Sequence, residues 1–157
     1  MVLKSYAKIN LTLSINNKLK SGLHSIQSIY CLIDLHDKIT LKKNRNKNFD
    51  RVIFTGPFSK DVNKSNNSVK KILNAMRKNN IINNYYSVKV NKKIPVFAGL
   101  GGGTSNAATI LKHLTKKSLN KKTLNKITEE VGSDLRLFFH NQGYQKNLQS
   151  VIKLNTE

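Results

Sequence analysis

The chain has 157 residues, with 28 Lys and Arg against 8 Asp and Glu, which gives a formal net charge of +20. One domain is expected at this length, and a disulfide scaffold is excluded because Cys31 is the only cysteine. No apolar run approaches the roughly 20 residues that cross a bilayer, and the amino terminus lacks the apolar core of a signal peptide. We therefore expect a globular protein without a membrane segment, located in the cytoplasm.

The high charge has two explanations, which the composition leaves open. A strongly basic chain commonly binds nucleic acid, an anionic surface or an anionic ligand. However, only four of the 28 basic residues are arginines, and proteins that read nucleic acid favour arginine, whose planar fork grips phosphates and guanines. Abundant lysine and asparagine are also typical of a proteome-wide bias in composition. Nucleic acid is therefore not the expected partner, although the surface will attract phosphates.

The first third of the chain reads as strands. Alternation from Ile9 to Ile15 places apolar side chains on one face of a half-buried strand, with Lys8 and Asn10 on its polar face. Residues 16–25 are polar and indicate a loop. Further strands are expected at residues 26–35, 38–42 and 50–55.

The rest of the chain mixes helices with strands. Helical spacing of apolar residues predicts a helix over 68–78, capped by Ser65 or Asn66. We expect Gly132 to end a later helix in the left-handed conformation. The remaining expectations are a strand at 85–90, helices at 104–114 and 124–131, a short strand at 135–140 and weak alternation in the tail. This order is typical of an α+β fold.

The most informative segment is a glycine loop directly before a predicted helix. It contains Gly99 and Gly101, Gly102 and Gly103, followed by the hydroxyl donors Thr104 and Ser105. Glycines allow positive φ and close approach of a ligand, and a helix start offers unpaired N–H groups. The segment therefore indicates a phosphate site. It is neither a Walker A loop nor a Gly-x-Gly-x-x-Gly motif. The alternative is a flexible loop with a good helix start.

Two charged residues are candidates for chemistry beside this loop. Lys8 on its strand could hold a negative charge, although one lysine among many is commonly only surface. Asp134 stands between a glycine turn and an apolar run, where a carboxylate could act as a general base or bind magnesium. The alternative for Asp134 is a loop-capping role.

The motifs of residues 5–140 resemble those of the GHMP kinases, and most closely the subgroup that phosphorylates 4-diphosphocytidyl-2-C-methyl-D-erythritol in non-mevalonate isoprenoid synthesis. The glycine loop marks the superfamily, and the Ala-Lys-Ile-Asn opening with Gly-x-His marks the subgroup. The matching segments are Ala7–Leu11, Gly22–Ser25, Asn67–Val69, Lys92–Pro95, Gly99–Ala108 and Gly132–Asp134.

The resemblance implies a fold, a reaction and residue roles. The fold would be the lobe that resembles ribosomal protein S5 domain 2, a mixed sheet with helices on one face. The cofactors would be ATP and Mg²⁺, with no metal site of the protein's own. Asp134 would take the proton from the substrate hydroxyl and Lys8 would hold that hydroxyl. The other implied roles are ATP binding by Asn67, Lys92, Gly99, Gly101, Gly102, Gly103, Thr104 and Ser105, and contact with the cytidyl substrate by Asn10 and His24.

The chain also departs from the subgroup. Leu23 replaces a tyrosine that stacks on cytosine, and Arg136 replaces a proline. We expect an ATP-binding domain over residues 1–140 and a divergent tail over 141–157, without the family's C-terminal domain. Three hypotheses stay open: a kinase completed by a partner chain or homodimer, a nucleotide-binding remnant without catalysis, and a basic RNA-binding protein. The last hypothesis predicts that affinity for a polyanion falls steeply with salt and that the protein does not bind ATP.

Overall fold

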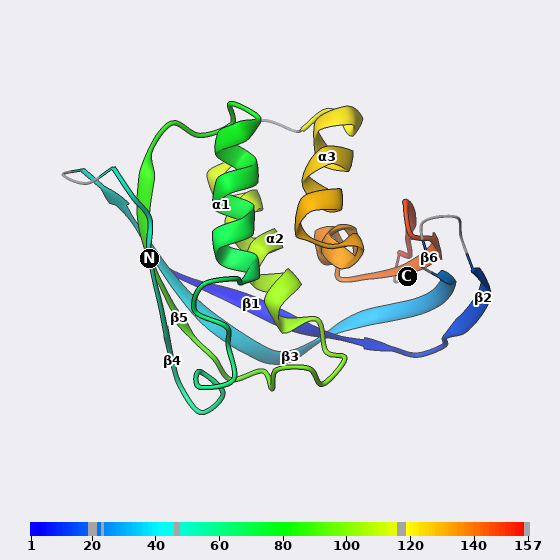
Figure 1. The fold of residues 1–157 in the computed structure, drawn as a ribbon. Coiled ribbons are helices and arrows are strands. Elements are labelled where there is room, and N and C mark those ends of the chain that lie inside the picture. Colours follow the sequence, from blue (N-terminus) through cyan, green and yellow to red (C-terminus); the bar gives the residue numbers. More distant parts are fainter. Residues whose placement is uncertain (19–21, 23, 46–47, 116–118, 156–157) are drawn as a thin grey trace.

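The computed structural model describes residues 1–18, 22, 24–45, 48–115 and 119–155. These residues form one seven-stranded mixed sheet with the helices packed on one of its faces (Figure 1). The predicted α+β architecture is therefore confirmed. None of the helices among these residues is long and apolar enough to cross a membrane.

The strands are ordered β4-β5-β3-β6-β7, with β1 and β2 also paired to β3, and only β4 and β5 run parallel. Their bounds are β1 Val2–Asn10, β2 Ser14–Lys18, β3 His24–Asn44, β4 Arg51–Thr55, β5 Tyr85–Asn91, β6 Gln142–Asn147 and β7 Ser150–Lys153. The helices are α1 Ser68–Lys78, α2 Gly102–Leu114, α3 Lys121–Val131 and the 3₁₀ helix η1 Ser133–Phe139.

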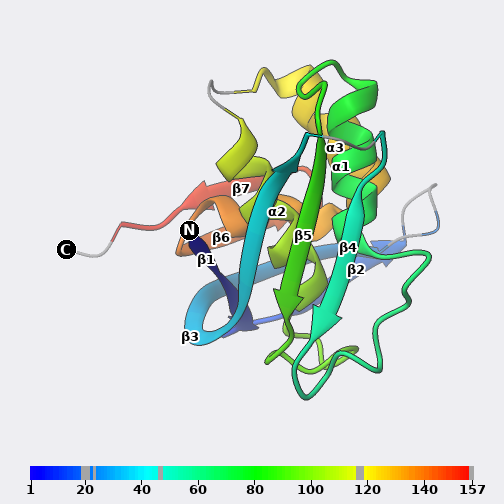
Figure 2. The same cartoon turned by 90° about the vertical axis from the view of Figure 1, so that its left-hand side faces the viewer.

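Strand β3 organises the sheet. The two strands predicted at 26–35 and 38–42 are one continuous strand of 21 residues. Its register with β1 shifts between Tyr6, opposite His36, and Ala7, opposite Ile33. Such a bulge bends a strand, and β3 is strongly curved in Figure 2. One curved strand can thus pair with β1, β2, β5 and β6.

The predicted first strand is wrong in its second half. Strand β1 ends at Asn10, and the N–H groups of Leu11 and Thr12 both donate to the carbonyl of Ile29. Leu11 and Leu13 are more than half exposed, as is Ile15 in β2. Alternation predicted a buried apolar face, but no described element covers these side chains. Lys8, expected on the open polar face, is buried instead.

Helix α1 has the predicted bounds, but its cap is Asn67 rather than Ser65 or Asn66. The Asn67 side chain accepts a 3.1 Å hydrogen bond from the N–H of Lys70, which is the preferred N-cap arrangement. The apolar side of the helix lies on the sheet and on α2. Its buried members are Val69, Ile72, Leu73, Ala75 and Met76.

The segment after α3 differs from the prediction. Gly132 ends α3 as predicted, and its N–H donates to the carbonyl of Thr128, but its φ of +146° and ψ of 143° are not those of the left-handed helical conformation. The N–H of Leu135 then donates to the carbonyl of Gly132, and residues 133–139 coil as η1 instead of forming a strand. Leu135, Leu137 and Phe138 of η1 are buried all the same. They close the core at the end of α2, which brings Asp134 close to β1.

Candidate active site

The glycine loop leads into α2, which begins at Gly102 rather than at Thr104. Gly101 caps this helix with φ +67°, the left-handed conformation that favours glycine. A Cβ on Gly101 would lie 2.6 Å from Cζ of Phe138, and one on Gly102 would lie 2.8 Å from Cγ2 of Ile94. The backbone at Gly101 and Gly102 is therefore packed tightly against the core, and a side chain is excluded at both positions.

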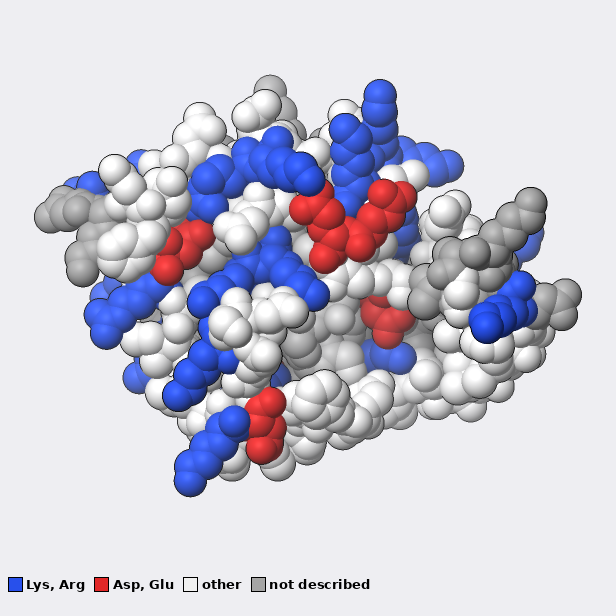
Figure 3. All heavy atoms as spheres, viewed as in Figure 1, with Lys and Arg blue, Asp and Glu red and all other residues white. Residues whose placement is uncertain are grey.

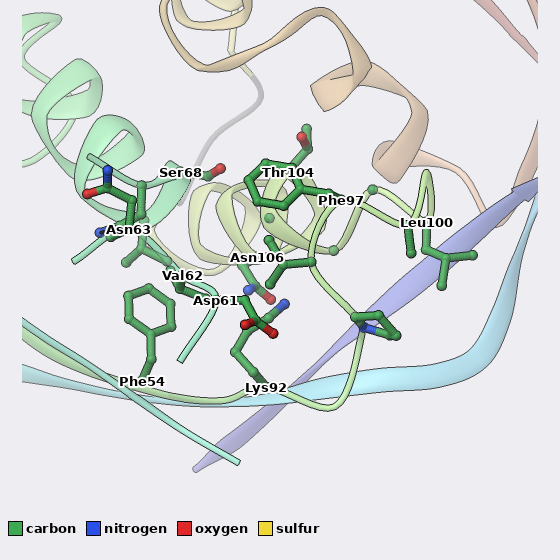
Figure 4. A pocket seen from close by; sticks show the side chains of 18 of the residues that line it. Phe54, Asp61, Val62, Asn63, Ser68, Lys92, Phe97, Leu100, Thr104 and Asn106 are labelled. Carbon is green, nitrogen blue, oxygen red and sulfur yellow. Dashed lines mark hydrogen bonds between the residues drawn. The ribbon is translucent and has the colours of Figure 1, made fainter. Parts of the chain in front are cut away.

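A cavity of about 370 Å³ opens beside this loop (Figure 4). The starts of two helices meet there, since a Cβ on Gly103 in α2 would lie 3.0 Å from Oγ of Ser68 in α1. Helix starts carry unpaired N–H groups and partial positive charge. The cavity is further lined by the loop around Asp61 and by Lys92. One wall of the cavity is apolar, and the helix starts with Lys92 form an end that can bind an anion.

Lys8 and Asp134 lie together at the edge of the glycine loop. The Lys8 Nζ is 3.7 Å from Oδ2 of Asp134 and donates a 3.0 Å hydrogen bond to Oδ1 of Asn10. The backbone N–H of Lys8 donates to the carbonyl of Leu100 at 3.0 Å. The Lys8 side chain is 7% exposed and that of Asp134 is 38% exposed. The carboxylate is thus accessible while the ammonium is fixed.

A second buried pair supports the other side of the cavity. Lys92 donates to Oδ2 of Asp37, and Oδ1 of Asp37 accepts from the N–H groups of Lys93 and Ile94 at 2.7 and 2.9 Å. Asp37 is fully buried and Lys92 nearly so. Asp37 therefore holds the lead-in to the glycine loop. Asp37 was not a candidate in the sequence, because it falls between the two strands predicted at 26–35 and 38–42.

Known proteins are similar to the part of the chain that holds this site. The family model described as GHMP kinases N terminal domain matches residues 67–140, the part that holds the glycine loop and Asp134. This segment of the chain is therefore similar to the N-terminal domain of the GHMP kinases.

Relatives and solved structures match nearly all of the chain. A 4-diphosphocytidyl-2-C-methyl-D-erythritol kinase of Pelagibacter ubique is 43% identical over 86% of this chain and 48% of the relative. A chloroplastic/chromoplastic kinase of the same name from Solanum lycopersicum is 36% identical over 98% of this chain and 39% of the relative. The crystal structure of a 4-(cytidine 5'-diphospho)-2C-methyl-D-erythritol kinase superposes with a TM-score of 0.69 at 21% identity, over 98% of this chain and 55% of that one. The chain spans about half the length of these relatives.

The residues expected to bind ATP fall into two groups. Asn67, Lys92, Gly99 and the run from Gly101 to Thr104 line the cavity. Ser105 does not, because its Oγ donates to the carbonyl of Tyr6 at 2.6 Å and accepts from Oγ of Ser5 at 2.8 Å. The Ser105 hydroxyl therefore ties α2 to β1.

Another polar side chain lines the cavity and was not a candidate in the sequence. Asn106 is 2% exposed, and its Oδ1 is buried without a hydrogen-bond partner. In Figure 4 its amide points toward the same space as Lys92. A buried acceptor without a partner is costly, which is typical of a site that a ligand completes.

The residues expected to contact substrate are less closely grouped. Asn10 lies beside Lys8, but His24 is exposed at the start of β3, opposite Lys18, and does not line the cavity. Leu23 lies outside the described residues. Arg136 of η1 donates from Nη2 to Oδ1 of Asn125 in α3 at 2.5 Å. Burial lowers the pKa of Arg136, and the charge of Glu129 opposes that shift.

Proposed function

We propose that this chain is the ATP-binding half of a kinase that phosphorylates the 2-hydroxyl of 4-diphosphocytidyl-2-C-methyl-D-erythritol in non-mevalonate isoprenoid synthesis. The observation that carries this proposal is the Lys8–Asp134 pair, attached through Leu100 to a glycine loop that opens into a nucleotide-sized cavity. The names of the relatives support the substrate. The cytoplasmic location stays a prediction.

The cavity fits ATP in shape and in chemistry. The glycine loop and the starts of α1 and α2 offer N–H donors for a phosphate chain. The apolar side chains at the other end, including Phe54 and Val62, suit a base. Among the described residues, no group of three or more His, Cys, Asp or Glu side chains could hold a metal ion. We propose that Mg²⁺ binds together with the ATP phosphates rather than at a site of the protein's own.

The pair beside the loop suits proton transfer from an alcohol. ATP supplies the phosphoryl group, and the chain positions the acceptor. Asp134, with its accessible carboxylate, takes the proton of the substrate hydroxyl. Lys8 then stabilises the negative charge that develops on that oxygen, and Asn10 keeps the ammonium in place. Phosphoryl transfer depends mainly on such positioning and charge neutralisation.

A nucleotide-binding domain without catalysis is the second candidate, because the chain spans about half of its relatives. In a full kinase, further residues would cover the open side of Asp134 and hold the cytidyl group. Where these 157 residues act alone, a partner chain or a second copy of this chain would have to supply them. Both candidates share ATP binding and differ in turnover.

The decisive experiment measures ATP binding by calorimetry and ADP release with Mg²⁺ and 4-diphosphocytidyl-2-C-methyl-D-erythritol. We expect Asp134→Asn to abolish turnover while ATP affinity changes less than threefold. Asp34→Asn is the matched control, because Asp34 is an exposed acid of β3 beside His36. Turnover that survives in Asp134→Asn would remove Asp134 from the mechanism. ATP binding without turnover in the parent chain would favour the second candidate, and loss of both would contradict the nucleotide site itself.

A further inference from the structure

The outer face of the sheet, opposite the helices, collects basic side chains from four strands. Directly opposed residues of neighbouring strands lie on the same face. Lys4 of β1 is opposite Lys38 of β3, and Lys89 of β5 is opposite Thr40, two residues further along β3. The same face carries Lys42 of β3 and Arg51 of β4, each beside Ser87 of β5. We call this set, Lys4, Lys38, Lys42, Arg51 and Lys89, the outer basic face.

All five of these side chains are exposed. The buried residues between them along the strands, such as Ile39, Val88 and Val90, point to the helices instead. In Figure 2 the strands β3, β5 and β4 stand in front of the helices, so this face is open to solvent. The neutral side chains on it include Thr40, Ser87 and Asn91, which can donate hydrogen bonds.

No acid neutralises the outer basic face within the described residues of these strands. Asp37 points inward and is fully buried, and Asp34 lies at the β3 bulge, 3.2 Å from His36. The helical side differs, because Glu129 and Glu130 of α3 are exposed there among lysines. Figure 3 shows acidic groups beside basic ones on this helical side. The helices therefore carry charges of both signs, whereas the outer basic face carries positive charge alone.

We propose that the outer basic face binds single-stranded nucleic acid through its phosphates, without base preference. Strands lie about 4.8 Å apart and rise about 3.3 Å per residue, so the Lys89 Cα lies roughly 8 Å from those of Lys38 and Lys42. Lysines at this spacing can each meet a different phosphate of a flexible chain. The register also places Tyr6 and Tyr85 on this face, but both are partly buried, and their rings already contact His36 and Arg77. They are therefore not free for the base stacking that single-strand binding proteins commonly add. Lysine, rather than arginine, is consistent with binding of charge alone.

The shape of the face favours a flexible polyanion over a membrane. The sheet is strongly twisted between β1 and β4 (Figure 2), and a flat bilayer would touch only part of it. The exposed apolar residues on this face are Val2 and Ile53, whereas interfacial binding uses larger groups such as Trp, Phe and Leu. A single strand can follow the twist from Lys4 to Arg51.

The test compares two triple variants that lose the same charge. Lys38→Gln, Lys42→Gln and Lys89→Gln remove three cations of the outer basic face. Lys71→Gln, Lys122→Gln and Lys126→Gln remove three exposed lysines of α1 and α3. Binding of a fluorescent 20-nucleotide oligouridylate is measured by anisotropy over a range of salt concentrations, alongside vesicles with anionic phosphatidylserine. Calorimetry with ATP shows whether each variant keeps its nucleotide site.

We expect the triple variant of Lys38, Lys42 and Lys89 to weaken oligouridylate binding at least tenfold at low salt. Three lost phosphate contacts should reduce the slope of log K against log salt by about 2. The triple variant of α1 and α3 should change the affinity and the slope much less. ATP binding should be unchanged in both triple variants. Equal losses in the two triples would mean attraction by net charge alone and would overturn the proposal. Binding to vesicles but not to the oligonucleotide would also overturn it.

Discussion

The backbone N–H of Lys8 donates a 3.0 Å hydrogen bond to the carbonyl of Leu100, so strand β1 directly supports the glycine loop. The side chain of the same lysine lies 3.7 Å from Asp134. One residue therefore fixes the phosphate loop through its backbone and the proposed proton acceptor through its side chain. A rigid strand, rather than a free loop, sets the distance between them, and phosphoryl transfer depends on such positioning.

The glycine loop offers two alanine substitutions that separate crowding from backbone strain. Gly101 and Gly99 both have positive φ, at +67° and +73°. Alanine in this conformation costs roughly 1–2 kcal/mol at either position. Only at Gly101 would the new Cβ also lie 2.6 Å from Phe138, whereas Gly99 has open space around it. We expect Gly101→Ala to weaken ATP binding at least tenfold more than Gly99→Ala, measured by calorimetry. Equal affinities would show that the contact with Phe138 does not shape the loop.

The buried pair of Asp37 and Lys92 should be important for stability. Asp37→Asn keeps an acceptor for the backbone N–H groups but leaves the Lys92 ammonium buried without a counter-charge. Loss of one partner of a buried pair costs about 3–5 kcal/mol. We expect that loss in urea unfolding, and we expect Asp37→Asn combined with Lys92→Met to recover part of it.

The exposed pair of Lys78 and Glu130, 3.1 Å apart, is the control for that experiment. Glu130→Gln should cost no more than about 1 kcal/mol, because solvent screens surface pairs. If Asp37→Asn cost as little as Glu130→Gln, the buried pair would have no structural role. If the double variant were worse than Asp37→Asn alone, Lys92 would stabilise the fold without its partner.

The elements that depend on neighbouring residues in the sequence were predicted correctly. The bounds of α1 follow from its apolar spacing, and the glycine loop before α2 follows from composition alone. Lys8 and Asp134 were separate candidates in the sequence, and their pairing followed only from the family resemblance. In the structure they lie 3.7 Å apart, because η1 and β1 both pack against α2.

Long-range contacts could not be predicted from local patterns. Asp37 meets Lys92 across 55 residues, and nothing near either one signals the pair. Alternation predicted that Ile15 lies on a buried face, but its side chain is 64% exposed. Burial depends on which distant residues pack against a strand, and the pattern within the strand does not contain that information. Two strands were predicted where β3 is continuous, because a bulge looks like a break in a linear pattern.

The cap of α1 connects helix stability with the nucleotide cavity. The Asn67 Oδ1 accepts from the N–H of Lys70, while Nδ2 donates to the carbonyls of Asn63 and Lys64 at 3.1 and 3.3 Å. Asn67→Asp keeps the cap and loses the two loop contacts, whereas Asn67→Ala loses both. We expect Asn67→Ala to cost about 1 kcal/mol in urea unfolding and Asn67→Asp much less. Both should weaken ATP binding, measured by calorimetry, because Asn63, Asn66 and Asn67 border the cavity. Unchanged affinity in Asn67→Asp would show that the loop contacts are not needed for binding.

The hydroxyl of Tyr30 is a buried polar group that the fold does not satisfy. Tyr30 is fully buried, its hydroxyl has no hydrogen-bond partner, and burial raises its pKa to about 12. Removal of an unsatisfied buried hydroxyl should not destabilise the protein. We therefore expect Tyr30→Phe to match or exceed the parent by up to about 1 kcal/mol in urea unfolding at pH 7.

The same hydroxyl predicts a pH dependence above pH 10. The unfolded chain loses the Tyr30 proton near pH 10 while the native state keeps it until about pH 12, so the parent loses stability as pH rises through this window. Lysines titrate in the same range in both proteins, and the difference between the two curves isolates Tyr30. That difference should grow by about 1 kcal/mol between pH 9 and pH 11 in favour of Tyr30→Phe. Parallel curves would show that the buried hydroxyl ionises as easily as an exposed one, and a parent that is more stable at pH 7 would show that it has a bonding partner.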